Sequence, residues 1–246
     1  MRVAGLLISL TLLSLPAASG AEPPPSASTE DAQLRVLLVK LGQHGERIEE
    51  MKRRGSYTLS GQLERIDGDG EVQNRKELVI RVTGTGDAQK PKNDVVKYLE
   101  DGADKTAEAK KRAAERAAKK PNPKREFRVP FLPSEQPKYT FQLLGRDERF
   151  PGSVKVGFVA RTPSEDTWNG TAWVNEADGE IESMGFTFSE KPSFVDEARA
   201  SLVFGTQTAL GRAPSKITFE GKGGFLFIRR HYRGSATLSD AILTAK

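Results

Sequence analysis

The feature of this sequence that most constrains its fold is a long series of short runs in which apolar and polar residues alternate. Apolar residues recur at every second position of residues 57–63, where one of them is Gly61, and again of residues 78–82, and an Asp-Gly turn at residues 67–70 lies between these runs. Neighbouring side chains of a strand point to opposite faces, so a period of two predicts strands with one apolar face. An Asp-Gly turn between two such runs predicts a β-hairpin.

The second half of the chain repeats this pattern. Further alternating runs contain Phe141, Val156, Phe186, Leu202 and Phe219, and short turns separate them. With the first hairpin they predict about nine to ten strands that follow one another in a mainly β, antiparallel architecture. A sheet of this width twists and curls. Its apolar face therefore either fills a core of its own or leaves an apolar cleft.

An amphipathic helix is expected ahead of the sheet. Leu34, Leu41 and Ile48 lie on one face of a helix over residues 31–54, and Gly42 and Gly45 weaken its middle, where we expect a bend or a split. One such helix covers only part of a wide sheet.

A second, charged helical segment is expected as an insertion at residues 93–120. Its core, residues 104–120, consists almost wholly of Ala, Glu, Lys and Arg. These residues favour a helix, but they offer almost no large apolar side chain to bury, so we expect this helix to lie exposed.

The amino terminus has the three parts of a secretory signal peptide. One arginine precedes an apolar run from Val3 to Leu15, and small residues follow up to Ala21. The run is too short for a membrane span, which needs about 20 apolar residues. We expect residues 1–21 to be cleaved off, residues 22–30 to form a Pro/Ser-rich linker, and residues 31–246 to fold as one domain outside the cytoplasm.

The residue types needed for common catalytic and metal sites are scarce. The chain has no cysteine and two histidines, His44 and His231. Neither histidine has a second potential metal ligand at a sequence spacing typical of metal sites. No serine lies in a Gly-x-Ser-x-Gly turn. We expect both histidines to be structural or on the surface, and we predict no catalytic residue, no metal ligand, no cofactor and no enzymatic activity.

The formal net charge of +5 is concentrated in residues 105–128. A basic chain can bind nucleic acid or anionic lipid. An exported protein rarely meets nucleic acid, so we expect none as a partner. A solvated basic helix is the favoured interpretation of this segment, and contact with an anionic membrane surface is the alternative.

Soft, bulky side chains recur on the strands and on the first helix, and we expect them to share one side of the sheet. Side chains of this kind make adaptable surfaces for apolar ligands, although each of them also fits a filled core. The candidate ligand-binding residues are Leu38, Leu41, Phe141, Phe158, Trp173, Met184, Phe186, Phe188, Phe204 and Phe219.

One strand–turn–strand phrase resembles a recurring pattern of a known family. Residues 170–175 read Gly-Thr-Ala-Trp-Val-Asn, and residues 178–181 read Asp-Gly-Glu-Ile. With the signal peptide, the first helix and the antiparallel strands, this phrase resembles the bacterial outer-membrane lipoprotein carrier and receptor superfamily. Asn175 stands where that pattern has an acid, and the polar helix of residues 104–120 departs from the apolar lid helices of the family.

The resemblance implies an incomplete, strongly curved β-barrel lidded by helices, with acyl chains bound in the hollow. It implies a periplasmic carrier or receptor for lipid or lipoprotein acyl chains, peripheral to the outer membrane and acting in its biogenesis. Two alternatives stay open: a structural or interaction protein associated with the outer membrane, and a β-barrel without a ligand. The sequence predicts neither the ligand nor the oligomeric state.

Overall fold

The structure is a computed structural model that describes residues 29–86, 91–118, 127–148, 150–225 and 228–243. The predicted signal peptide and residues 22–28 of the predicted linker lie outside the described residues. Residues 29 and 30, the end of that linker, already belong to the first helix, α1 (Thr29–Arg54).

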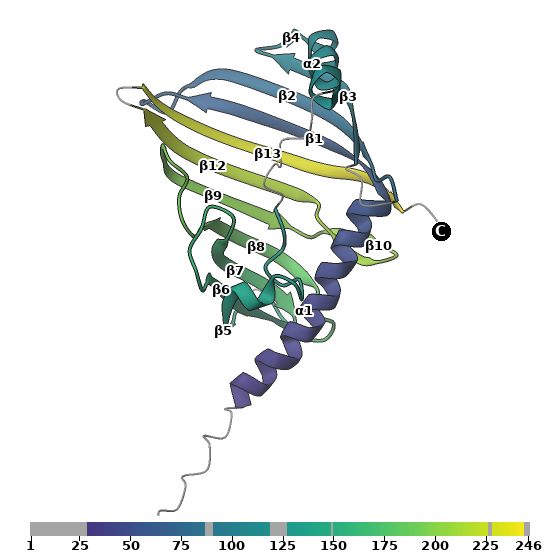
Figure 1. Cartoon of the computed structure of the whole chain (residues 1–246), viewed down its shortest axis with the longest axis vertical. Coiled ribbons are helices and arrows are strands. Elements are labelled where there is room, and N and C mark those ends of the chain that lie inside the picture. Colours follow the sequence, from purple (N-terminus) through teal and green to yellow (C-terminus); the bar gives the residue numbers. More distant parts are fainter. Residues whose placement is uncertain (1–28, 87–90, 119–126, 149, 226–227, 244–246) are drawn as a thin grey trace, which may run out of the picture.

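One large antiparallel sheet dominates the molecule (Figure 1). Eleven strands pair in the order β4-β3-β2-β1-β13-β12-β9-β8-β7-β6-β5, and its end strands β4 and β5 are not paired with each other, so the sheet is open. The strands of this sheet are β1 (Gly55–Ile66), β2 (Val72–Thr83), β3 (Lys92–Glu100), β4 (Ala103–Asp104), β5 (Tyr139–Arg146), β6 (Ser153–Ala160), β7 (Trp168–Asn175), β8 (Ile181–Phe188), β9 (Val195–Val203), β12 (Lys216–Phe225) and β13 (Ile228–Leu243). The predicted mainly β fold with an incomplete barrel is confirmed, with more strands than expected.

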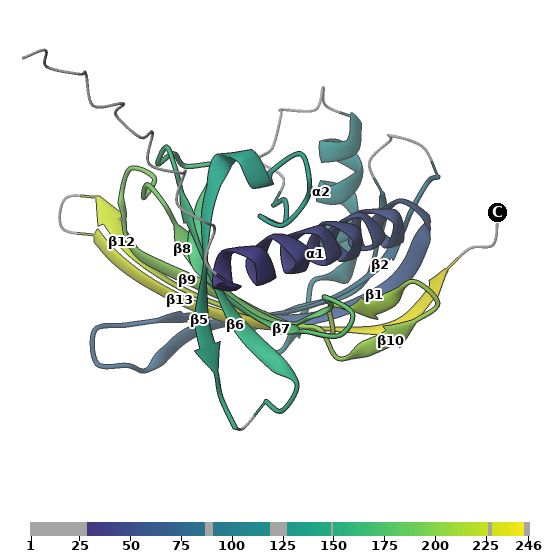
Figure 2. The same cartoon turned by 90° about the horizontal axis from the view of Figure 1, so that it is seen from below.

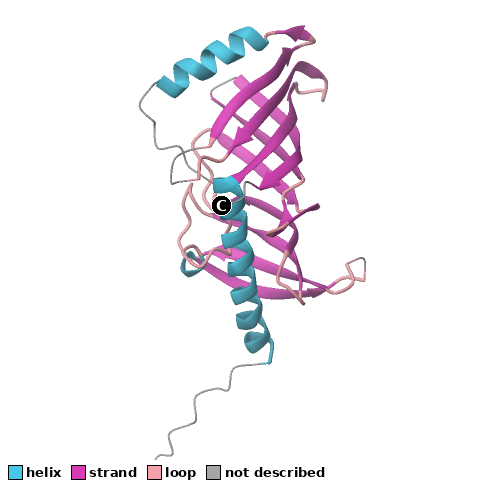
Figure 3. Cartoon of the chain, turned by 90° about the vertical axis from the view of Figure 1, so that its right-hand side faces the viewer, coloured by secondary structure: helices cyan, strands magenta, loops and turns pink. Residues whose placement is uncertain are grey.

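A small two-stranded sheet, β10 (Thr206–Thr208) and β11 (Gly211–Ala213), lies beside the large one. The two halves of the chain meet where β1 pairs with the last strand, β13, from Gly55 opposite Leu243 to Ile66 opposite His231. The sheet is strongly curved, and α1 lies in its hollow (Figures 2 and 3). A short 3₁₀ helix, η1 (Gln136–Lys138), precedes β5.

The core lies between α1 and the concave face of the sheet. Leu41 from α1, Phe158 from β6, Ile181 and Met184 from β8, and Phe204 are each at most 2% exposed. Successive turns of the helix and alternate positions of the strands supply these side chains, as the two periodicities of the sequence require. The expected role of α1 as an amphipathic cover is confirmed.

The first helix runs unbroken through its glycines, so the expected bend is wrong. Gly42 and Gly45 are buried, because the segment before β5 packs closely against them. A Cβ added at Gly42 would lie 3.2 Å from Pro133, and one at Gly45 would lie 3.3 Å from Leu132. Both glycines weaken the helix locally, but they let a loop approach its backbone.

The predicted helical insertion at residues 93–120 is helical only in its second part. Residues 92–100 form strand β3, which pairs with β2, and the helix α2 covers Thr106–Ala118. The register of this pair shifts at Val96 of β3, because Val79 pairs with Lys97 and Ile80 pairs with Val95, and this irregularity obscures the alternation in the sequence. As expected, α2 is mostly exposed over its described side chains, with only small residues such as Ala109 and Ala113 half-buried.

The convex face of the sheet carries ion pairs. Glu64 on β1 accepts hydrogen bonds from Arg233 Nε at 2.7 Å and from Arg75 Nε at 2.9 Å, and its side chain is only 5% exposed. These two guanidinium groups hold the pKa of Glu64 below its usual value. These ion pairs therefore link the neighbouring strands β2, β1 and β13 on the convex face.

The turn between β7 and β8 docks directly onto α1. Lys40 Nζ donates hydrogen bonds to the carbonyl oxygens of Glu176 and Ala177, at 3.0 and 2.8 Å. Gly179 has a φ of +72°, and a Cβ added there would collide with the Cβ of Lys40. Positive φ and close contact both require glycine at this position. The contact between α1 and the β7–β8 turn thus explains why glycine stands at position 179 of the segment that resembles the family pattern.

We expect Gly179→Ala to lower the free energy of unfolding by about 3 kcal/mol or more, because left-handed backbone strain of about 1–2 kcal/mol adds to a steric clash. Urea unfolding measures this effect. Gly102→Ala is the matched control, since Gly102 has a φ of +82° and its Cβ would meet nothing within 4 Å. Equal losses in the two variants would contradict the close contact between the turn and α1.

Candidate functional site

Most of the predicted ligand-binding residues lie together on the concave face beneath α1. Leu41, Phe158, Met184 and Phe204 belong to the buried core, and Leu38, Phe141 and Phe186 are partly buried against it. Their packing is dense: the ring of Phe158 lies 5.5 Å from that of Phe131 in an edge-on arrangement. These residues fill the space beneath the helix.

Two of the predicted residues lie toward the margin of this packed region. Phe188 on β8 is half-buried and packs against Trp168, with ring centroids 4.7 Å apart. Phe219 on β12 is 41% exposed, and its ring covers Gly234 on the neighbouring strand. Both therefore lie outside the densest part of the core.

Trp173 does not share this face. Its neighbours Ala172 and Val174 are buried in the core, so Trp173 points to the convex side of β7. There it stacks on Phe150 at 4.7 Å between ring centroids, and Lys155 Nζ lies 5.8 Å from its ring centre. The expectation that all ten residues face one side is wrong for Trp173.

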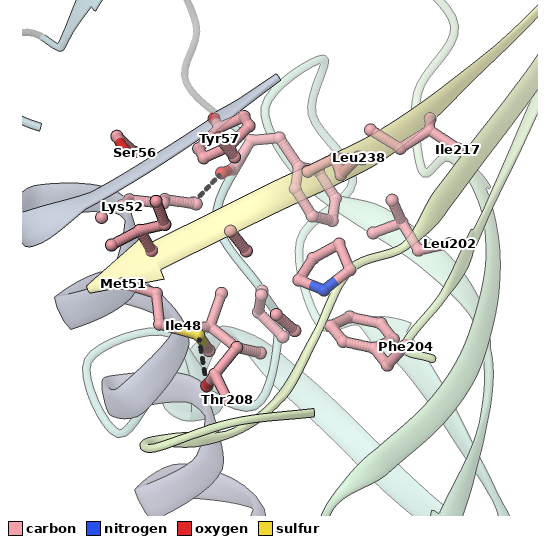
Figure 4. A pocket seen from close by; sticks show the side chains of 17 residues that line it. Ile48, Met51, Lys52, Ser56, Tyr57, Leu202, Phe204, Thr208, Ile217 and Leu238 are labelled. Carbon is pink, nitrogen blue, oxygen red and sulfur yellow. Dashed lines mark hydrogen bonds between the residues drawn. The ribbon is translucent and has the colours of Figure 1, made fainter. Parts of the chain in front are cut away.

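An apolar cavity of about 190 Å³ lies farther along α1, at the end of the helix that leads into β1 (Figure 4). It is lined by α1, the first residues of β1, the end of β13, residues of β9 and β12, and the segment around β10 and β11. Its lining consists of Ile48, Met51, Lys52, Gly55, Ser56, Tyr57, Phe127, Val129, Leu202, Phe204, Thr208, Ala213, Pro214, Ile217, Leu238, Ala241 and Ile242. This cavity is the candidate ligand site.

The polar groups of the lining are few, and most of them have partners. Lys52 Nζ is 2.7 Å from Glu49 Oε1 and 3.5 Å from the carbonyl oxygen of Phe127. Thr208 Oγ1 donates to the carbonyl oxygen of Gly211 at 2.7 Å. Burial raises the pKa of Tyr57 above its usual value, so its hydroxyl stays neutral at pH 7. An apolar ligand that enters the cavity therefore desolvates few polar groups, so the desolvation cost of binding is small.

Of the ten predicted residues, Phe204 alone lines this cavity. Sequence reasoning missed the others because they come from separate parts of the chain. Tyr57 and Leu238, for example, lie on the paired strands β1 and β13. Leu59, two residues after Tyr57, pairs with Leu238, so knowledge of this strand pair would have brought the two sides of the cavity together.

His44 links α1 to the two segments that flank the core and the cavity. It is fully buried, its Nδ1 accepts a hydrogen bond from the backbone N–H of Ile181 at 2.9 Å, and its Nε2 lies 2.9 Å from the carbonyl oxygen of Arg212. Its ring lies edge-on to Phe204, at 5.9 Å between centroids. The expected structural role of His44 is confirmed.

His231 lies on the convex side, where its Nε2 is 2.8 Å from Glu220 Oε1. In the part of the chain that the structure describes, no three His, Asp or Glu side chains are grouped so that they could hold a metal ion. Within the same residues no helix is long and apolar enough to cross a membrane.

No protein-family model matches the sequence, and no curated protein does either. Among solved structures, the chain is similar to a domain assigned to outer membrane lipoprotein sorting from Vibrio parahaemolyticus, with 15% identity, 84% of this chain and 91% of that chain covered, and a TM-score of 0.42. It is also similar to a LolA superfamily protein from Nitrosomonas europaea, with 11% identity, coverage of 82% and 93%, and a TM-score of 0.34.

A DUF1329 family protein from Desulfovibrio piger is a third similar structure, with 9% identity, coverage of 84% and 92%, and a TM-score of 0.39. The descriptions of the first two agree with the resemblance drawn from the sequence. With TM-scores below 0.5 and identities of at most 15%, these likenesses carry no argument about function.

The two faces of the sheet predict different costs for aromatic substitutions. Phe158→Ala should lower the free energy of unfolding by about 3–5 kcal/mol, as expected for a filled core position. Trp173→Ala should cost about 1–2 kcal/mol, because it loses one ring stack and one contact with a lysine. Thermal or urea unfolding of both variants checks this order. A larger loss for Trp173→Ala would place that side chain in the core.

Proposed function

We propose that the protein is a periplasmic carrier or receptor that binds an apolar ligand, a lipid or lipoprotein acyl chain, in the cavity between α1 and the sheet. The observation that carries this proposal is an apolar cavity of about 190 Å³ beside a densely filled core. Packed protein interiors contain few voids larger than a water molecule. A hollow of this size with an apolar lining fits an apolar occupant.

The size and lining of the cavity suit a hydrocarbon segment. A dry apolar cavity of about 150 Å³ in another protein binds benzene. Each methylene group that leaves water contributes about 0.8 kcal/mol, so a segment of about five such groups gains about 4 kcal/mol before the entropic costs of binding. The cavity lining offers many apolar surfaces, among them Leu202, Ile217 and Leu238, for such contacts.

The rim of the cavity gives a ligand a route to solvent. Ile242, near the end of β13, lines the cavity and is 58% exposed. Lys52 also lines it, with its side chain 35% exposed. A chain could thus be inserted while a polar head group stays in water. Export by residues 1–21 and the folding of residues 31–246 as one domain are part of this proposal.

Filling the cavity tests the proposal. We expect the protein to take up N-phenyl-1-naphthylamine, an uncharged dye that fluoresces in apolar surroundings, and we expect Ala213→Leu to weaken this uptake at least tenfold, because the leucine enters the cavity. Ala213 is 8% exposed and lines the site. Fluorescence titration at pH 7.5 gives both affinities.

Ala114→Leu is the matched control, since Ala114 lies exposed on α2, away from the cavity lining. It should bind the dye as the wild type does, and circular dichroism should show all three proteins folded. Absence of dye uptake by the wild type, or unchanged uptake by Ala213→Leu, would reject the cavity as the ligand site.

An interaction module is the second candidate, and the convex face favours it. Leu144 is 47% exposed and Val159 is 56% exposed on strands β5 and β6, on the same face of the sheet as the stacked pair of Trp173 and Phe150. Exposed apolar groups that gather on one face are typical of contact surfaces. This role needs no ligand in the cavity, so dye uptake that is sensitive to Ala213→Leu separates the two candidates.

A further inference from the structure

The hydrogen bonds of His44 fix its protonation state. Nδ1 accepts from the N–H of Ile181, so it carries no hydrogen, and the carbonyl oxygen of Arg212 can only accept, so Nε2 carries the hydrogen. The imidazole is therefore neutral when α1 is docked. One ring thus joins α1 to β8 on one side and to β11 on the other.

Protonation removes one of these two bonds. In the imidazolium both ring nitrogens are donors, and no rotation of the ring restores an acceptor for the N–H of Ile181. Two N–H groups then face each other across a distance that is now 2.9 Å. Because the ring is fully buried, water cannot replace the lost acceptor while the helix stays in place.

Charged groups of both signs face the ring from the three elements around it. Arg47 comes from α1, Asp178 and Glu180 come from the β7–β8 turn, and Arg212 comes from β11, where it lies 3.5 Å from Glu180. Burial lowers the pKa of His44, and Arg47 adds to this, whereas the bond to Arg212 and the carboxylates of Glu180 and Asp178 oppose it. The balance favours the neutral ring.

The cavity begins one helical turn from His44. Ile48, four residues further along α1, lines the cavity, and so does Phe204, whose ring lies edge-on to the imidazole. A shift of α1 that relieves the imidazolium therefore moves the wall that Ile48 forms relative to the wall that Phe204 forms. The apolar contacts of a bound ligand with those walls would be lost with it.

We infer that His44 makes ligand binding sensitive to mild acid, so that protonation of its imidazole loosens α1 and releases the ligand from the cavity. This inference rests on the proposed ligand site. When α1 has moved away from the sheet, His44 is free to take up a proton below the ordinary histidine pKa of about 6.5. This undocked state then binds one proton more than the docked state, in which the ring is held neutral. Affinity should therefore be constant above that pH and should decrease below it.

The test measures the affinity for N-phenyl-1-naphthylamine between pH 7.5 and pH 5. The wild type should lose affinity below about pH 6.5, by at most about tenfold per pH unit because one proton is involved. His44→Gln, whose amide can accept from Ile181 and donate to Arg212 without titrating, should show no such loss. His231→Gln is the matched control and should follow the wild type, since His231 lies on the convex face beside Glu220.

A pH dependence that is equal in the wild type and in His44→Gln would overturn the role of His44 while leaving the ligand site intact. Absence of dye binding at pH 7.5 would reject the proposed function instead.

The wild type alone provides a second readout that does not depend on the dye or on the folding of a variant. The ¹⁵N shifts of His44 should show an unprotonated Nδ1 at pH 7.5, and exchange of the Ile181 amide, corrected for its intrinsic rate, should accelerate below pH 6.5. Unchanged exchange would also overturn the inference.

Discussion

The docking of α1 into the hollow of the sheet is the contact on which the rest of this structure depends. The sheet presents a wide apolar face, and Leu37, Leu41, Ile48 and Met51 of this one helix supply much of the cover for it. Three kinds of polar contact fix the helix in register: the Lys40 ammonium on the turn carbonyls, the buried imidazole of His44, and Arg47 near Glu180. Apolar burial provides the stabilisation, whereas these directional contacts determine the position of the helix.

The two halves of α1 have different surroundings, and this difference creates the candidate site. Its first half packs onto the filled core around Phe158 and Met184. Its second half lies over the paired strands β1 and β13, where Tyr57 and Leu238 line the apolar cavity. His44 lies between these halves.

Neither of the two α-helices in the described residues covers the convex side of the sheet in Figure 2, so the described part of the sheet has no second layer on that side. Cross-strand ion pairs such as Arg75–Glu64–Arg233 and Arg199–Glu220 cover the middle of this face. The guanidinium groups of these pairs are more than half exposed, so each pair contributes little, but the pairs keep the face polar and the strands in register. The pairing of β1 with β13 requires the last strand, so the sheet is complete only when nearly the whole chain is present.

The sequence by itself determined the period of two, the amphipathic first helix, the polar second helix and hence a mainly β, antiparallel fold with one apolar face, because these depend on local spacing. The open, incomplete barrel was implied only by the family resemblance, and the strand order of the structure shows it. It failed for β3, where a bulge hides the alternation, and for Trp173, whose small neighbours Ala172 and Val174 take the core positions. Only the tertiary structure decided where the cavity lies. Its walls come from α1, β1, β9, β12 and β13 and from the segment around β10 and β11, and pairing of β1 with β13 brings residues together that no local spacing relates. Packing between distant segments is fixed by the shapes that meet there, and a sequence pattern of short range cannot contain that information.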